Sequence, residues 1–413
     1  MPAAKVLKPC RNCGANLVTT FVDLGMSPLS NSYVPLDRAD AMEPFYPLHA
    51  FVCDACLLVQ VEAFETPEQI FGNYAYFSSY SDSWLEHSRA YATSAIDRLK
   101  LHQGDLVAEA ASNDGYLLQY FQHAGLRVLG IEPARNVAGV AIQKGIPTES
   151  VFLGAQTGAT VAQRYGAAKL VVANNVIAHV PDLHDFVSGL RSLLAHDGTL
   201  SIEFPHLLHL IESVQFDTIY HEHFSYYSLL SMEDVLARHG LRVWDVEELP
   251  THGGSLRVWA VTSDDERPPE ARVEAMRQKE RERGLASIET YAAFSASVVQ
   301  RKRDVLTFLI QAAEQGKTVA GYGAPAKGNT LLNYCGIRSD MIAYTVDRNP
   351  AKQHVLLPGS HIPVYAPEHI SRTKPDYVFI LPWNIRDEVV EQTSWIREWG
   401  GRYVVAMPGV EIF

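Results

Sequence analysis

The sequence predicts an α/β protein with two doubly wound domains and a small N-terminal domain. Two observations support this prediction: apolar strand-like segments alternate with helical segments in two separate stretches, and residues 1–68 lack that alternation. Strands separated by helices predict a parallel sheet with helices on both faces. A chain of 413 residues is also too long for one hydrophobic core, so two or three domains are expected.

Four of the five cysteines form two short pairs in the N-terminal domain, Cys10 with Cys13 and Cys53 with Cys56. Two such turns bring four thiolates to one ion, in the tetrahedral shell that zinc prefers in structural sites. A closed four-sulfur shell leaves no position for water, so this zinc is expected to hold the fold together and to leave the chemistry to other residues. The alternatives are four reduced thiols without a metal, or a disulfide.

Three further parts follow: a central α/β domain (69–265), a helical bridge (266–312) and a C-terminal α/β domain (313–413). The first central helix is expected at 116–123, and the central strands at 105–110, 127–131, 169–173 and 199–203. The bridge begins at Arg267-Pro268-Pro269 and then becomes dense in Glu, Arg and Lys, which is typical of a solvated helix. The C-terminal strands are expected at 317–320, 341–346, 376–381 and 402–406.

A ligand-binding turn is predicted where the first central strand enters its helix. Small or polar residues let a ligand approach the backbone there: Glu109, Ala111, Asn113 and Gly115. The second strand ends near Glu132, whose carboxylate can accept hydrogen bonds from both hydroxyls of a ribose. The turn is not G-x-G-x-x-G and has little room for a pyrophosphate, so it suits S-adenosylmethionine, which has no phosphates. The alternative is an ordinary strand-turn-helix.

Asn174 and Asn175 follow the strand at 169–173. The carboxyl edge of an open α/β sheet is where ligands bind, so either asparagine can hold the same cofactor. His179 comes next and can face the substrate; the alternative is a histidine that caps a helix or lies in the core.

The densest group of reactive side chains lies in residues 216–227, which contain His221, Glu222, His223 and three tyrosines. These residues offer metal ligands, but the two histidines lack the i,i+4 spacing of a zinc protease helix. Acid–base chemistry is the better interpretation. A histidine can remove a proton from carbon next to a carbonyl, a phenol can donate to the resulting oxyanion, and a carboxylate can orient the imidazole. The alternative is a polar-aromatic layer under a loop.

Together these motifs resemble the bacterial sugar C-methyltransferases that act on dTDP-linked keto-deoxysugars. The resemblance spans nearly the whole chain and rests on the cysteine pairs and on seven strings: 74–81 (YAYFSSYS), 112–118 (SNDGYLL), 130–133 (GIEP), 174–180 (NNVIAHV), 220–224 (YHEHF), 252–255 (HGGS) and 321–329 (GYGAPAKGN). It implies a zinc-binding N-terminal domain, a central Rossmann-like methyltransferase domain and a C-terminal Rossmann-like domain. It also implies S-adenosylmethionine as methyl donor and a 4-keto sugar nucleotide as acceptor.

The resemblance implies roles for individual residues. His223 is the expected general base, which deprotonates a sugar carbon, C-3 rather than C-5, next to the 4-keto group. Its expected neighbours around the sugar are Tyr74, His179, Tyr220 and Glu222. Tyr76 and Ser78, in a tyrosine- and serine-rich cluster expected to form a lid, are predicted substrate contacts.

The C-terminal string allows a second hypothesis. Residues 321–328 follow a strand and Asp347 ends the next one, which is close to the dinucleotide fingerprint of an NAD-dependent nucleotide-sugar oxidoreductase. The glycine spacing departs from that fingerprint, however, and Pro325 lies inside the loop. We therefore expect a domain that closes over the sugar nucleotide, with Lys327 near its phosphates. A zinc-containing scaffold without activity would leave the acid–base cluster unexplained.

The composition of the chain limits which binding partners and which cellular location are expected for this protein. The formal net charge of −12 argues against general binding to nucleic acid, which needs a basic surface. No apolar run reaches the ~18 residues of a membrane span, and no signal peptide is recognisable, so a cytoplasmic location is expected. The fifth cysteine, Cys335, is expected to be a buried apolar residue.

Overall fold

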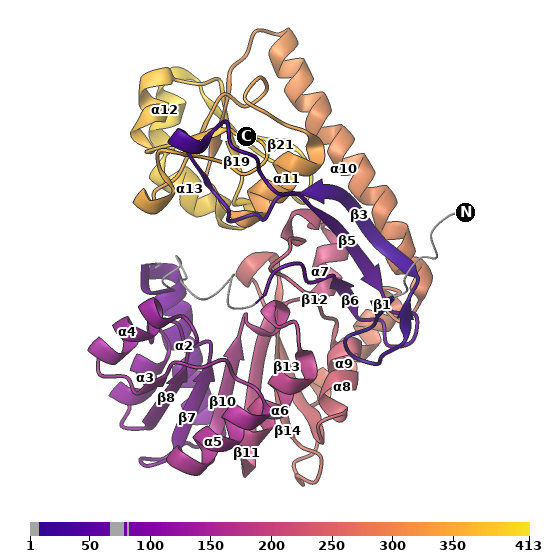
Figure 1. The fold of residues 1–413 in the computed structure, drawn as a ribbon, viewed down its shortest axis with the longest axis vertical. Helices are drawn as coiled ribbons and strands as arrows, with labels where there is room; N and C mark the ends of the chain where they lie inside the picture. Colours follow the sequence, from indigo (N-terminus) through magenta and orange to yellow (C-terminus); the bar gives the residue numbers. More distant parts are fainter. Residues whose placement is uncertain (1–7, 67–77, 81) are drawn as a thin grey trace.

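The computed structural model describes residues 8–66, 78–80 and 82–413. Figure 1 shows a central α/β unit, a C-terminal α/β unit, and N-terminal strands that run beside the long helix α10 (Ile288–Glu314). Among the described residues, no helix combines the length and the apolar character needed to cross a membrane.

The N-terminal strands carry both cysteine pairs in hairpin turns. The first pair lies between β1 (Lys8–Pro9) and β2 (Asn16–Leu17), and the second between β5 (Tyr46–Val52) and β6 (Val59–Val61). A four-stranded antiparallel sheet has the order β12-β6-β5-β3 and adds β3 (Thr19–Ser27) and β12 (Ser225–Tyr226). The last strand comes from the central domain, so this sheet ties residues 225–226 to the N-terminal segment.

The central sheet has seven strands in the order β13-β14-β11-β10-β7-β8-β9. Their bounds are β7 (Leu106–Ala110), β8 (Arg127–Ile131), β9 (Thr148–Glu149), β10 (Ala168–Asn174), β11 (Leu194–Pro205), β13 (Leu241–Leu249) and β14 (Ser255–Thr262). Strands β7 to β11 are parallel to their neighbours within this group. Because the strand order reverses between β7 and β10, their carboxyl ends form the crevice where ligands bind in such sheets.

Two strands differ from the parallel sheet that the strand–helix alternation predicts. β14 pairs antiparallel with both β11 and β13. The short turn at 250–254 joins β13 to β14, and parallel neighbours would need a much longer crossover connection. His252, Gly253 and Gly254 all adopt positive φ in this turn.

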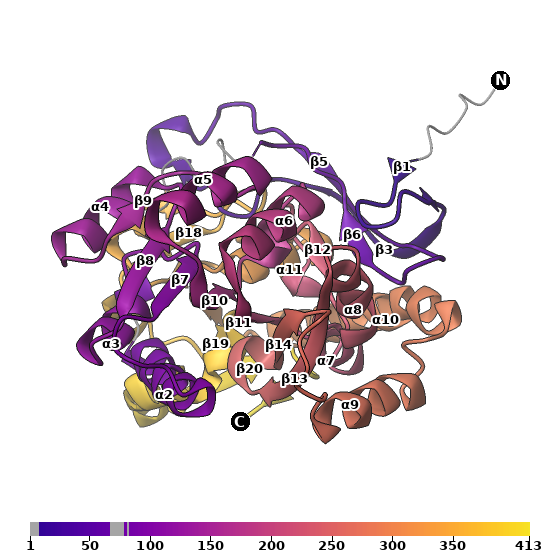
Figure 2. The same ribbon diagram turned by 90° about the horizontal axis from the view of Figure 1, so that it is seen from below.

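Helices cover both faces of the central sheet: α2 (Asp82–Leu99), α3 (Leu118–His123), α4 (Arg135–Gln143), α5 (Ala155–Tyr165), α6 (Leu183–Leu193) and α8 (Leu229–Ala237). The short helix α7 (Leu207–Glu212) follows β11 and packs in the cluster of the N-terminal strands and α10. Figure 2 shows α5 and α6 on one side of the strands and α2 on the other. Neighbouring residues of β10, such as Val171 and Val172, belong to different buried clusters because side chains alternate along a strand. The cluster beside α6 also contains Cys10 and Cys53, so the cysteine turns pack against the central domain.

α9 (Ala271–Glu282) and α10 lead into an eight-stranded sheet of order β21-β20-β19-β15-β16-β18-β17-β4. The elements of this part are β15 (Val319–Tyr322), α11 (Ala326–Cys335), β16 (Thr345–Val346), β17 (Val355–Leu356), β18 (Pro363–Tyr365), α12 (Glu368–Thr373), β19 (Tyr377–Ile380), α13 (Arg386–Gln392), β20 (Arg402–Val405) and β21 (Glu411–Ile412). The edge strand β4 (Val34–Pro35) comes from the N-terminal segment and pairs with β17. The N-terminal segment therefore contributes strands beside both α/β units.

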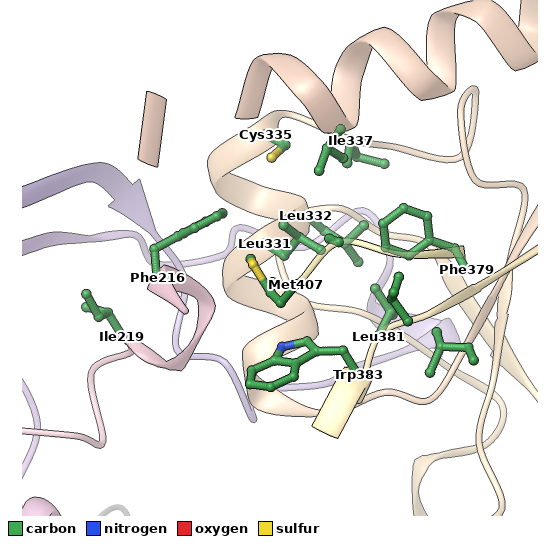
Figure 3. Packing of buried hydrophobic residues seen from close by; sticks show 14 of the residues in the cluster. Phe216, Ile219, Leu331, Leu332, Cys335, Ile337, Phe379, Leu381, Trp383 and Met407 are labelled. Atoms are coloured by element: carbon green, nitrogen blue, oxygen red, sulfur yellow. The ribbon is translucent and has the colours of Figure 1, made fainter. Parts of the chain in front are cut away.

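One buried cluster joins the N-terminal strands, α10 and the C-terminal sheet. Figure 3 shows Phe216 and Ile219 beside α11, which carries Leu331 and Cys335. Cys335 is buried, as its sequence context predicts. This packing anchors the start of the reactive segment, residues 216–227, on the C-terminal domain.

Candidate active site

A cavity of about 520 Å³ lies at the carboxyl ends of β7, β8 and β10. Most of the site residues predicted from the sequence line it: Ser78, Ala111, Asn113, Glu132, Asn174, Asn175, His179, Tyr220, Glu222, His223 and Lys327. Tyr74 and Tyr76 lie outside the described residues. The cavity thus joins groups from the central and C-terminal domains.

Two predicted cofactor residues are not among those that line the cavity. Glu109 is fully buried inside β7, where burial raises the pKa of its carboxyl group and the nearby hydroxyl of Tyr116 opposes this effect. Gly115 lies in the turn with φ +78°, and a Cβ at this position would meet Cδ1 of Ile146 at 2.3 Å. Glu109 and Gly115 thus belong to the strand and the turn beside the cavity, and neither is among the residues that line it.

Glu132 shapes the cofactor side of the cavity. Its carboxylate accepts hydrogen bonds from the backbone N–H groups of Asn113 (3.0 Å) and Ala134 (2.9 Å). Burial raises the pKa of Glu132, and the two backbone donors oppose this effect. Ala111 and Asn113 adopt φ values of 54° and 50°, an uncommon conformation for residues other than glycine. Such strain is often kept where a ligand needs the backbone in one place.

The two asparagines at the carboxyl end of β10 present unsatisfied polar atoms. Oδ1 of Asn174 and both side-chain heteroatoms of Asn175 are buried without a hydrogen-bond partner in the described part of the chain. Val151, Phe152 and Leu153 form an apolar wall of the same cavity. This set fits S-adenosylmethionine: a carboxylate for its ribose, amides for its polar groups and an apolar surface for its adenine.

Tyr220 and His223 form the reactive pair of the cavity. Nδ1 of His223 donates to the carbonyl oxygen of Thr218 (2.9 Å). In the neutral ring Nε2 must therefore accept, and it receives the hydroxyl of Tyr220 at 2.7 Å. The backbone carbonyl of Thr218 thus selects the tautomer and the direction of the imidazole.

Glu222 does not orient His223 as a carboxylate partner would. Nδ2 of Asn31 donates to both of its carboxylate oxygens, at 2.8 and 3.0 Å. The backbone carbonyl of Glu222 instead accepts from Nδ1 of His179 (2.8 Å), whose ring centroid lies 4.6 Å from that of His223. Because the backbone of Thr218 already orients the imidazole, the Glu222 carboxylate is left to face the cavity.

Burial, more than the neighbouring charges, holds the histidines of the cavity neutral. Burial, then the neighbouring His179, Lys327 and His252, lower the pKa of His223 well below its usual value. Burial also lowers the pKa values of His179 and His252 to about 4. All three imidazoles therefore carry a lone pair at neutral pH.

Lys327 brings a cation from the first turn of α11. Its Nζ donates to Oδ1 of Asn384 (3.0 Å) and lies 4.7 Å from the ring centroid of Trp383. Burial lowers the pKa of Lys327, and the nearby carboxylate of Asp217 opposes this effect. Trp383 also donates its indole N–H to Asp217 (2.7 Å). A buried lysine in such a site is suited to an anionic ligand.

The C-terminal loop does not favour the dinucleotide hypothesis. The carboxylate of Asp347 accepts from the N–H groups of Ala324 (2.7 Å) and Asn349 (2.8 Å). Glu132 accepts the same pair of backbone bonds, so this pattern alone does not separate the two carboxylates; unlike Glu132, however, Asp347 is not among the residues that line the cavity. A Cβ at Gly323 would meet Pro382 at 2.5 Å, so the loop itself packs closely.

The metal interpretation of the reactive segment is not supported by the geometry. Nε2 of His221 donates to the carbonyl of Pro47 (3.3 Å), and His221 does not line the cavity. Within the described residues, the four cysteines are the group whose ligand atoms can share one ion, with their Sγ atoms within 4.8 Å of one another.

The cysteine shell fits zinc. The Sγ atoms of Cys10 and Cys56 are 3.6 Å apart, and those of Cys13 and Cys53 are 3.4 Å apart. Tetrahedral coordination with Zn–S bonds of about 2.3 Å separates sulfurs by about 3.8 Å. Nε2 of Gln60 donates to Sγ of Cys10 at 3.1 Å, a contact typical of the outer shell of a zinc site.

The cavity is also lined by residues that the sequence does not single out as site residues, among them Asn31, Trp84 and His252. His252 belongs to a string that carries the family resemblance, and it adopts positive φ, as do the two glycines that follow it. Asn31 and Trp84 lie in segments without any such signal. Their positions depend on contacts with residues far away in the chain.

A Rossmann-like sheet with a cavity at the carboxyl ends of its strands, in a chain that also carries a four-cysteine shell, fits the class of S-adenosylmethionine-dependent methyltransferases. Family models agree with this: a putative zinc binding domain matches residues 10–71, a methyltransferase domain residues 84–246, and a C-methyltransferase C-terminal domain residues 250–408. The chain is 38% identical over 399 residues to C-methyltransferase NovU of Streptomyces niveus. The alignment covers 97% of this chain and 95% of that relative. The chain belongs to this C-methyltransferase family. It is an S-adenosylmethionine-dependent enzyme with a structural zinc site.

Solved structures with similar folds have much lower identity. Magnesium protoporphyrin IX methyltransferase from Synechocystis PCC 6803, with bound SAM, is 19% identical and covers 48% of this chain and 89% of that chain, with a TM-score of 0.34. A S-adenosylmethionine-dependent methyltransferase from Clostridium acetobutylicum is 9% identical and covers 43% and 92%, with a TM-score of 0.35.

Proposed function

We propose that this enzyme methylates C-3 of a dTDP-linked 4-keto-deoxysugar, through an enolate formed by removal of the C-3 proton. The observation that carries the proposal is the Tyr220–His223 pair, which shares one cavity with Glu132 and Asn175. The resemblance of the motifs to sugar C-methyltransferases supports the choice of acceptor.

His223 is the proposed base. With Nδ1 donating to Thr218, the lone pair on Nε2 is the position that can receive a proton from carbon. The lowered pKa keeps this lone pair free, but it also weakens the base. An anionic acceptor offsets this effect, because its diphosphate neutralises Lys327 and so raises the pKa of His223.

Tyr220 is the proposed oxyanion donor. In the structure its hydroxyl donates to Nε2 of His223. When a ketone oxygen lies nearby, the hydroxyl can turn to that oxygen as it becomes an enolate, and this frees Nε2 to take the adjacent C–H proton. One rotation of the hydroxyl thus prepares the base and the oxyanion donor together. The carboxylate of Glu222, with His179 on the other side of the pair, is a candidate contact for a sugar hydroxyl or amine.

Bound S-adenosylmethionine supplies an electrophilic methyl group on its sulfonium. We assign its binding to the central domain (69–265), through Glu132, Asn174 and Asn175. The nucleotide of the acceptor is assigned to the C-terminal domain (313–413), with Lys327 at its phosphates. The N-terminal domain (1–68) holds zinc, and the bridge (266–312) joins the two α/β domains. Tyr74, Tyr76 and Ser78 remain proposed contacts of the sugar.

The decisive experiment follows the C-3 proton. A panel of dTDP-4-keto-deoxysugars is incubated with the enzyme and S-adenosylmethionine, and the site of methylation is read by mass spectrometry and NMR. In D₂O with S-adenosylhomocysteine in place of the donor, we expect exchange of the C-3 hydrogen without methylation. His223→Asn is expected to lose this exchange by about 10²–10⁴-fold while it keeps cofactor binding.

His221→Asn is the matched control, because His221 is a buried histidine of the same segment that does not line the cavity. We expect it to retain exchange. Exchange at the parent rate in His223→Asn would remove this residue from the role of base. Methylation at C-5 alone would contradict the assigned carbon.

A further inference from the structure

Arg11 connects the first cysteine turn to the segment that carries His223. Its backbone N–H donates to Oε1 of Gln60 (2.9 Å), the same side chain that donates to Sγ of Cys10. Its guanidinium reaches across to donate to the backbone carbonyl of Phe224 and to Oγ of Ser225 (3.0 Å). One arginine thus contacts both the metal-binding turn and the residues directly after His223.

The position of this cation needs an explanation. In the described part of the chain no carboxylate forms an ion pair with Arg11. Its guanidinium also donates to the carbonyl of Val61 (2.9 Å), and its Cζ lies 5.5 Å from the centroid of the Phe224 ring. Arg11 directly follows Cys10, one of the four cysteines whose sulfur atoms lie within reach of one ion. Four thiolates around one Zn²⁺ carry a net charge of −2, so the complete shell is a suitable counter-ion for Arg11.

Phe224 is held on both of its backbone groups. Its N–H donates to the carbonyl of Ala178 (2.7 Å), just before His179. Its carbonyl accepts from the N–H of Val61 (3.0 Å) as well as from Arg11. The main chain next to His223 is therefore fixed from one side by the cofactor-binding domain and from the other by the cysteine domain.

We propose that Arg11 is a positioning residue for His223, through which the zinc-binding turns set the direction of the catalytic imidazole. The proposal rests on the proposed function for the role of His223. It assigns the N-terminal domain a part in catalysis although its metal shell is closed. A base displaced by about 1 Å can lose up to 10² in rate, so loss of the Arg11 contacts is expected to lower kcat by about 10–100-fold.

The test compares Arg11→Met and Arg11→Lys with Arg238→Met. Arg238 is the matched control, because it also interacts with Cys13 and Cys56, but its guanidinium pairs with the exposed carboxylate of Asp234. Four quantities are measured for each full-length variant: zinc per chain, Tm, kcat with both KM values, and the ¹⁵N signals of the His223 ring.

We expect Arg11→Met to retain one zinc per chain, an unchanged KM for S-adenosylmethionine and a Tm close to that of the parent. We expect kcat of Arg11→Met to fall and its His223 ring signals to shift. Arg11→Lys should have a kcat and ring signals between those of Arg11→Met and the parent, because it keeps the charge and one donor. Arg238→Met should match the parent in all four measurements.

Unchanged ring signals and kcat in Arg11→Met would overturn the proposal. The proposal would also be overturned if Arg11→Met and Arg11→Lys both lost zinc in proportion to their loss of activity. Arg11 would then stabilise the metal site without positioning His223. Failure of the proposed function has a different signature: His223→Asn would stay active, while the ring signals of His223 would still move in Arg11→Met.

Discussion

The hydroxyl of Tyr220 lies 2.7 Å from Nε2 of His223, while Nδ1 of the same ring is bonded to the backbone of Thr218. The proposed base and the proposed oxyanion donor therefore occupy adjacent positions in the lining of the cavity. Both side chains come from one short loop, so a small number of backbone contacts positions the pair.

Tyr220→Phe removes the proposed oxyanion donor and leaves the imidazole in place. We expect kcat to fall by about 10²–10³-fold, because the enolate oxygen loses a hydrogen bond that develops with its charge. The affinity for S-adenosylmethionine, measured by calorimetry, should not change. Tyr226→Phe is the control, since Tyr226 is buried in the same segment but does not line the cavity. A parent-like kcat for Tyr220→Phe would assign the oxyanion to another donor.

Glu132→Gln tests the cofactor side. Hydrogen bonds to a charged acceptor contribute about 1.5–3 kcal/mol, so the dissociation constant for S-adenosylmethionine should rise by about 10–100-fold. The KM of the acceptor should change little. Glu149→Gln is the matched control at the end of the neighbouring strand β9, where Glu149 bonds to Arg164 and Tyr165 outside the cavity. Equal affinities for the two variants would contradict the role of Glu132.

Lys327→Met tests the assignment of the acceptor's phosphates. We expect KM for the sugar nucleotide to rise by about 10–100-fold, with a weaker salt dependence, because a buried cation no longer faces the diphosphate. Lys302→Met is the control, since Lys302 also lies over an aromatic ring, that of Tyr334, but outside the cavity. If the KM for the sugar nucleotide were unchanged in Lys327→Met, the assignment of the phosphates to Lys327 would be wrong.

The buried histidines predict how stability depends on pH. The pKa of His179 is lowered to about 4 in the folded protein, whereas the unfolded chain binds this proton near pH 6.5. Between these values the unfolded state holds more protons, so the free energy of unfolding falls as the pH falls, by about 1.4 kcal/mol per pH unit for this group. Above pH 6.5 His179 is neutral in both states, so its protonation no longer lowers the free energy of unfolding.

His179→Gln should reduce that slope between pH 6.5 and 4.5 in urea denaturation experiments. Above pH 7 the two proteins should have parallel stability curves, because the histidine is neutral in both states there. An identical slope in the acidic range would mean that His179 is protonated in the folded protein.

Several features could be predicted because they depend on short patterns. The cysteine pairs indicate a metal site through their spacing alone, and Glu132 follows from its place at the end of a strand. The alternation of strands and helices predicts the sheets but not the direction of β14, which depends on the length of the turn at 250–254.

Other parts of the site depend on atoms that carry no sequence signal. The imidazole of His223 is oriented by a backbone carbonyl, and every residue type has one. Asn31 contacts Glu222 across 191 positions, and its segment resembles an ordinary loop. A carboxylate was the expected partner of the imidazole because it is a common one, but the fold directs Glu222 towards Asn31 instead.

Local patterns along the chain were thus sufficient for the α/β class and the four-cysteine shell, and they indicated the candidate reactive side chains, since these follow from residue type and spacing. Tertiary structure alone decided which of these groups share a cavity, which tautomer His223 adopts and that Arg11 links the metal-binding turn to it. These relationships join residues far apart in the chain, and only close packing of the N-terminal, central and C-terminal parts brings their atoms within hydrogen-bonding distance.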